Sequence, residues 1–176
     1  DRSMRDAIFT ALEWLHDERE VSVLLVRGNG RAFSTGGDLS EFGTAPSPVR
    51  AREVRRQRDV WRLWSTLPCV SIAAVHGPAV GGGLEMALLC DLVVCAHDAR
   101  LALPETGLGL VPGVGGTQTL PRAVGEGRAA AMLLAGDAID GRTAARIGLA
   151  QRSVPAARLR ATADALARRV AALDPS

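Results

Sequence analysis

Three times along the chain, a short apolar segment rich in β-branched residues leads into a glycine-rich turn, and the turn leads into a helical pattern. The apolar segments are 21–28, 70–77 and 91–96, and the turns are 28–42, 79–83 and 107–120. Strands that alternate with helices in this way are typical of a parallel sheet. The order therefore predicts an α/β fold with parallel strands and ligand-binding turns at the carboxyl ends of those strands.

Helical spacing of apolar residues predicts further helices over 4–17, 49–67, 127–135, 140–147 and 156–173. In the arginine-rich helix 49–67, Val54, Trp61 and Trp64 are expected to face inward. Asp38 is a candidate N-cap, because its side chain can accept the N–H bonds that the start of a helix leaves unpaired.

Composition excludes several kinds of chemistry. All 21 basic residues are arginine, so lysine nucleophiles and Schiff bases are excluded, and the absence of tyrosine excludes a phenolic acid. A net charge of +2 gives no strong indication of a nucleic-acid or membrane partner. We expect no metal site, because the three histidines lack metal-ligand spacing, and we expect His76 to form a turn hydrogen bond.

Length and cysteine usage indicate one domain in a reducing compartment. At 176 residues, the chain 1–176 is expected to be a single domain, with its core to about residue 125 and trailing helices over 126–176. The cysteines form no C-x-x-C pair, and Cys90 and Cys95 are expected in the core. No signal peptide and no apolar run of about 18 residues is visible, so we predict a cytoplasmic protein.

Two of the turns, TGGD at 35–38 and VGGG at 80–83, expose their backbone amides. The first amides of a helix have no internal partner and can donate to a negatively charged oxygen. Two such turns converging on one carbonyl would form an oxyanion hole. Phosphate binding is the competing interpretation, although neither turn fits G-x-G-x-x-G in full context. A third interpretation is that these glycines serve only tight turns and close packing between helix and strand.

Two glutamates lie beside glycine-rich turns. Glu85 follows VGGG within an apolar helix, where a carboxylate needs a partner. Glu105 follows Pro104 in an extended segment and, taken alone, resembles a solvated turn residue. Together they would supply the two carboxylates of an acid–base pair. Their spacing in the sequence does not show whether they meet.

Three long motifs, in order, resemble the enoyl-CoA hydratase/isomerase (crotonase) family: FSTGGDLSEF at 33–42, HGPAVGGGLEMALLCDLVVCA at 76–96, and LALPETGLGLVPGVGGTQTLPRAVG at 101–125. The segment LLAGDAIDGRTAARIGLAQRSV is similar to the family's trailing helices. The resemblance implies a ClpP-like spiral of repeated β-β-α turns, with parallel strands and surrounding helices.

The resemblance also implies roles for individual residues. The amides of Gly37 and Gly82 would form the oxyanion hole for a thioester carbonyl. Glu85 and Glu105 would be the acid–base pair that adds water across the 2,3 double bond of an enoyl-CoA. Retention of both glutamates favours a hydratase. Isomerases, decarboxylases and thioesterases of the family, or a non-catalytic homologue, are the alternatives.

The coenzyme A portion of the substrate would bind at the first motif, around Ser34, Thr35, Gly36 and Asp38. The carbonyl of Thr35 is expected to contact the adenine amine, while Asp38 caps the helix that follows. Coenzyme A would enter as part of the substrate, so no separate cofactor is expected. The family also implies a homotrimer or a hexamer.

Parts of the family's pattern have no counterpart in this sequence. The N-terminal strands, with a basic residue that often helps to hold the CoA phosphates, would precede Asp1, and long C-terminal helices would follow Ser176. We therefore expect the chain to be incomplete at both ends.

The arginine-rich segment 50–62 is not explained by this reading. A solvated basic face with Glu53 and Asp59 as local partners is the favoured interpretation. Contacts with CoA phosphates or an acidic carrier protein are a second. RNA binding is a third, which the small net charge and the scarcity of aromatic residues disfavour.

Overall fold

A computed structural model describes residues 1–173 of the chain. The chain divides into two compact units. The first unit consists of Asp1–Ser22 and Gly37–Cys69, and the second consists of Val23–Gly36 and the chain from Val70 onward. The prediction that 1–176 acts as one domain stays a prediction, and each unit is described by itself.

The first unit is helical. It contains α1 (Arg2–Asp17), the single 3₁₀ turn η1 (Leu39–Glu41), α2 (Pro48–Gln57) and α3 (Val60–Ser65). α1 packs against α3, and the two helices bury Leu12, Leu15, Val60 and Trp64. His16 adds a polar link, since its Nε2 donates to the Leu63 carbonyl at 2.9 Å.

The prediction of one helix over 49–67 is wrong, because the chain breaks between α2 and α3. Arg58 leaves helical geometry, and the Asp59 carboxylate accepts the N–H of Arg62 at 3.0 Å, which starts a new helix. Asp59 is thus a cap, whereas Glu53 does pair with Arg50 at 2.6 Å.

The break also changes which side chains face inward. Trp64 is buried, as predicted, and Trp61 is partly exposed. Val54 is 52% exposed, because it lies on α2, which has no buried residue among those described. Its inward orientation is therefore a wrong prediction.

Asp38 caps a helix start, as predicted. Its carboxylate accepts the Ser40 hydroxyl at 2.7 Å and the Ser40 N–H at 3.0 Å. The pKa of Asp38 is lowered, first by the hydroxyl bond and then by the backbone bond.

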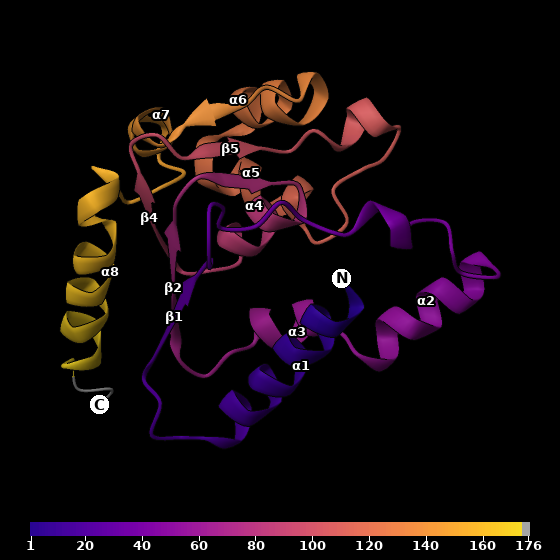
Figure 1. Ribbon diagram of the computed structural model, residues 1–176, viewed down its shortest axis with the longest axis horizontal. Coiled ribbons are helices and arrows are strands. Elements are labelled where there is room, and N and C mark those ends of the chain that lie inside the picture. The colour runs from indigo at the N-terminus through magenta and orange to yellow at the C-terminus, as the bar shows by residue number, and fades with distance from the viewer. Residues whose placement is uncertain (174–176) are drawn as a thin grey trace. The chain divides into compact units, whose positions relative to one another are not determined.

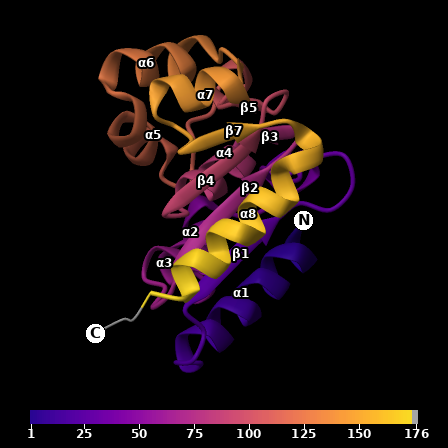
Figure 2. The same ribbon diagram turned by 90° about the vertical axis from the view of Figure 1, so that its left-hand side faces the viewer.

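The second unit is built on a four-stranded parallel sheet. The strands are β1 (Val23–Arg27), β2 (Val70–Val75), β4 (Leu92–Ala96) and β7 (Arg152–Val154), in the order β1-β2-β4-β7. The predicted parallel pairing is confirmed. The long helix α8 (Ala156–Ala171) packs against all four strands; it lies along one side of the sheet in Figure 1 and in front of β1 and β2 in Figure 2.

A second, three-stranded sheet has the order β3-β5-β6. Its strands are β3 (Pro78–Val80), β5 (Arg100–Ala102) and β6 (Ile139–Asp140). The helical elements of this part are α4 (Gly82–Leu88), η2 (Glu105–Leu108), α5 (Gly116–Val124), α6 (Glu126–Ala130), the π-helical turn η3 (Ala131–Ala135) and α7 (Gly141–Ile147).

Cys90 and Cys95 are buried, as predicted. Burial raises the pKa of the Cys95 thiol to about 11, so this side chain behaves as a small core residue. Among residues 1–173, no helix is long and apolar enough to cross a membrane.

Candidate active site

The strands β3 and β5 deliver two helical segments to one edge of the second sheet. They pair in parallel, with Val80 opposite Ala102, and the Gly81 N–H extends the ladder to the Ala102 carbonyl at 2.9 Å. The chain leaves β3 into α4 and leaves β5 into η2. Because parallel strands end at the same edge, the segments that carry Glu85 and Glu105 start next to each other.

Gly81 allows the Glu105 carboxylate to approach the backbone. Its φ of +56° is a conformation that other residues rarely adopt. A Cβ placed on Gly81 would lie 3.0 Å from the Glu105 Oε1 atom. Glycine at this position therefore gives Glu105 room at the entry to α4.

Glu85 is the charged side chain that the described core buries, at 2% exposure. Its Oε1 accepts the backbone N–H groups of Val114 and Gly116, both at 2.8 Å. These amides lie at the start of α5, where the helix dipole stabilises negative charge. Two donors and a favourable dipole offset the cost of burying this carboxylate, and they fix its orientation.

Glu105 lies in a different environment. It is half-buried, and among the described residues its buried Oε2 atom has no hydrogen-bond partner. Desolvation raises the pKa of the Glu105 carboxyl; a backbone hydrogen bond opposes this shift in part, and the negative charge of Glu85 adds a smaller increase. The two predicted glutamates are thus close enough for the charge of one to shift the pKa of the other, and their surroundings differ.

The turn 34–36 packs against the start of α4. Ser34 forms a parallel bridge to Ala79, and its Oγ accepts the Gly36 N–H at 3.3 Å. A Cβ placed on Gly36 would lie 3.1 Å from the Gly82 nitrogen. Gly82 is the first residue of α4, a position whose N–H has no acceptor within the helix.

The oxyanion-hole and CoA-binding roles of the other predicted residues stay predictions. Gly37 belongs to the first unit and Gly82 to the second, so the pairing of their amides in an oxyanion hole stays a prediction. Thr35 is exposed at the end of the second unit's turn. The CoA contacts of Ser34, Thr35, Gly36 and Asp38 stay predictions as well.

The sequence did not lead us to predict the amides of Val114 and Gly116 as the hydrogen-bond donors to Glu85. The run PGVGG at 112–116 resembles the two turns that were interpreted as amide donors. The available indication was a third glycine-rich turn directly before a helix. Its free amides could have been predicted to pair with the buried carboxylate of Glu85.

Replacing Gly116 with alanine is expected to displace Glu85. The new Cβ would lie 3.0 Å from the Glu85 Cγ and Oε1 atoms and 3.1 Å from a Leu103 methyl carbon. We expect kcat for hydration, the reaction that the family resemblance implies, to fall roughly 10- to 100-fold because the carboxylate is misplaced, with a stability loss of about 1–3 kcal/mol from overpacking. Steady-state kinetics and denaturant unfolding measure the two effects.

The control for this substitution is Gly127→Ala in α6. A Cβ at Gly127 meets no atom within 4 Å, and helix propensity favours alanine by up to about 1 kcal/mol. Unchanged kcat in Gly116→Ala would show that the amides of the α5 start do not position Glu85 for catalysis.

No metal-binding cluster accompanies the carboxylates. Within residues 1–173, no group of three or more His, Cys, Asp or Glu side chains could hold a metal ion. His76 forms a hydrogen bond, but not within its own turn as predicted: its Nε2 donates to the Gly30 carbonyl at 3.0 Å, 46 residues away in the sequence.

The fold and this site define a class: an α/β protein with a parallel sheet and two carboxylates beside glycine-rich helix starts. The sequence model of the enoyl-CoA hydratase/isomerase family matches residues 1–175, and the chain belongs to this family. Solved structures with the crotonase fold superpose closely, which confirms the predicted fold class. Pseudomonas aeruginosa DspI has a TM-score of 0.91 at 40% identity, over 99% of this chain and 67% of that protein.

Curated relatives include hydratases. The 2,3-dehydroadipyl-CoA hydratase of Escherichia coli K12 is 41% identical over 141 residues, covering 78% of this chain and 53% of that protein. The crotonyl-CoA hydratase of Syntrophomonas wolfei is 40% identical over 146 residues, covering 82% of this chain and 56% of that protein. The chain therefore spans little more than half the length of these relatives.

Proposed function

We propose that this protein is an enoyl-CoA hydratase, which adds water across the 2,3 double bond of a trans-2-enoyl-CoA to give a 3-hydroxyacyl-CoA. The observation that carries the proposal is the pair of unlike carboxylates at the edge of the β3–β5 sheet. Glu85 is held by two backbone amides, and Glu105 has a raised pKa and an unpaired buried oxygen. Family membership and the hydratases among the relatives support the same chemistry.

In the proposed reaction, the two carboxylates share one water molecule. Glu85 accepts a proton from the water, whose oxygen forms a bond to C3. Glu105, whose surroundings favour its protonated form, gives a proton to C2. The π electrons of the double bond pass through the thioester enolate, whose oxygen receives hydrogen bonds from the amides of Gly37 and Gly82. Proton exchange between the two carboxyl groups then restores the starting state.

The rest of the proposal concerns binding and assembly. Ser34, Thr35, Gly36 and Asp38 would surround the coenzyme A portion, which arrives with the substrate, so no separate cofactor takes part. The working protein would be a cytoplasmic homotrimer or hexamer, as its family implies.

The test is the loss of the conjugated-thioester absorbance when the purified protein meets crotonyl-CoA or 2,3-dehydroadipyl-CoA, followed by mass spectrometry of the product. Hydration adds the mass of one water, and with ¹⁸O-labelled water the label must appear in the product. An unchanged mass with a shifted double bond would identify an isomerase, and a free acid or a lost carboxyl group would identify a thioesterase or a decarboxylase. Folded protein that leaves 2-enoyl thioesters of short and long chain unchanged would overturn the proposal.

A further inference from the structure

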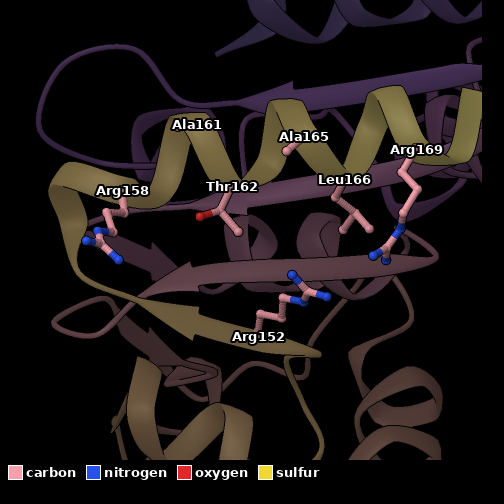
Figure 3. A pocket seen from close by; sticks show the side chains of 7 residues that line it. All are labelled: Arg152, Arg158, Ala161, Thr162, Ala165, Leu166 and Arg169. Atoms are coloured by element: carbon pink, nitrogen blue, oxygen red, sulfur yellow. The ribbon is translucent and has the colours of Figure 1, made fainter.

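A groove unrelated to the two glutamates lies between α8 and the edge strand β7. Its volume is about 520 Å³, and Figure 3 shows its side chains from both elements. Three arginines border it: Arg152 on β7, and Arg158 and Arg169 on α8. The remaining lining residues are Ala161, Thr162, Ala165 and Leu166.

The groove contains no acidic side chain to balance these arginines. The acidic residue of α8, Asp164, pairs with Arg27 of β1 at 3.1 Å and with Arg160 at 3.9 Å. β1 and β7 are the opposite edges of the sheet, so the carboxylate of α8 is engaged at the edge away from the groove. Within residues 1–173, Arg152, Arg158 and Arg169 make no ion pair.

The arginines are spread along an elongated, partly apolar floor. Arg158 and Arg169 are separated by eleven residues, about 16 Å along a helix axis. In Figure 3, Arg152 and Arg169 extend toward the same end of the groove, and Arg158 lies at the other end. Thr162 lies between the ends and offers a hydroxyl, beside Leu166, which is buried.

We propose that this groove is a binding site for a small phosphate-bearing polyanion. Two guanidinium groups at one end can each donate paired hydrogen bonds to one phosphate group, the geometry that arginine provides better than any other side chain. Arg158 then receives a second phosphate or another anionic group of the same ligand. The lining residues include no aromatic side chain on which a base could stack, so the phosphates supply the recognition.

Isothermal titration calorimetry at low ionic strength tests this site, with inorganic triphosphate and ATP as the two probes. We expect both to bind at sub-millimolar concentration, with affinity that falls as salt rises. The double variant Arg152→Gln/Arg169→Gln should weaken binding at least tenfold. Equal affinities would identify a pure phosphate site, and at least tenfold tighter binding of ATP would identify a nucleotide site; both outcomes support the proposal.

Arg160→Gln/Arg168→Gln is the charge-matched control. It removes two positive charges, as the double variant does, but from positions of α8 that do not line the groove. The proposal is overturned if neither probe binds with a Kd below 1 mM, a value that corresponds to about 4 kcal/mol of binding free energy. Equal weakening by Arg160→Gln/Arg168→Gln and by Arg152→Gln/Arg169→Gln would also overturn it, since binding would then follow net charge alone. Neither outcome depends on hydratase activity.

Discussion

Glu85→Gln is expected to lower kcat for hydration by about 10²- to 10⁴-fold, the usual contribution of a positioned general base. An amide cannot accept the proton of the attacking water. Its carbonyl oxygen can still accept the N–H groups of Val114 and Gly116, which Glu85 now engages at 2.8 Å. We therefore expect the folded structure to persist and KM to change much less than kcat.

The measurement is steady-state kinetics with an enoyl-CoA substrate, together with thermal unfolding of the same preparation. Glu126→Gln, which makes the same chemical change at an exposed residue of α6, is the control and should retain full activity. A Glu85→Gln protein with more than a tenth of the parent's kcat would contradict the role of Glu85 as a base.

Glu105→Gln is expected to be comparably inactive and, in contrast to most substitutions at partly buried sites, not to lower stability near neutral pH. The pKa of Glu105 is raised, chiefly by desolvation. The folded protein therefore keeps this proton at pH values where the unfolded chain has released it. As pH rises from the ordinary pKa of glutamate to the raised pKa of Glu105, the free energy of unfolding therefore falls. Above the raised pKa, this loss of stability stays constant.

Glutamine removes that cost because it carries no charge to bury. The difference in Tm between Glu105→Gln and the parent should increase with pH across this window and then level off. A difference in Tm that does not vary with pH would contradict the raised pKa.

Activity provides a second measurement on the same residue. As an acid, Glu105 must be protonated, so kcat/KM of the parent should fall as pH rises through the raised pKa of Glu105. The residual activity of Glu105→Gln should lack this limb. If the limb persists in the variant, another group supplies the proton.

The sequence indicates which two carboxylates belong to the candidate site better than it indicates that they lie close together. Glu85 is predictable because an apolar run surrounds it and its charge must be satisfied. Glu105 has no such local indication, since its surroundings are created by β3, a three-residue strand that overlaps the start of the glycine-rich turn 79–83. The β3–β5 register that places Gly81 beside Glu105 is a long-range pairing, and no local pattern encodes it.

Errors in the predicted fold have similar causes. The helix over 49–67 was predicted from the helical spacing of its apolar residues, but the cap formed by Asp59 divides it. β7 was missed because three residues cannot display an alternating pattern, and its place at the sheet edge depends on pairing with β4. The strands β1, β2 and β4 were predictable, because each is a run of β-branched residues bounded by turn residues.

The division of the chain into two units has a consequence for the order in which the protein assembles during synthesis. β1 and β2 are neighbours in the sheet, yet most of the first unit, Gly37–Cys69, is made between them. β1 must therefore wait for Val70 to leave the ribosome before it finds its first partner.

If the connection between β1 and β2 were flexible, the entropic cost of bringing the two strands together would rise only slowly with its length. Each doubling of the length adds about 0.6 kcal/mol. A connection that has already folded, with α1 packed on α3, leaves fewer conformations to search. The packing of α1 on α3 would therefore shorten the search of β1 for β2 wherever it forms before the sheet does.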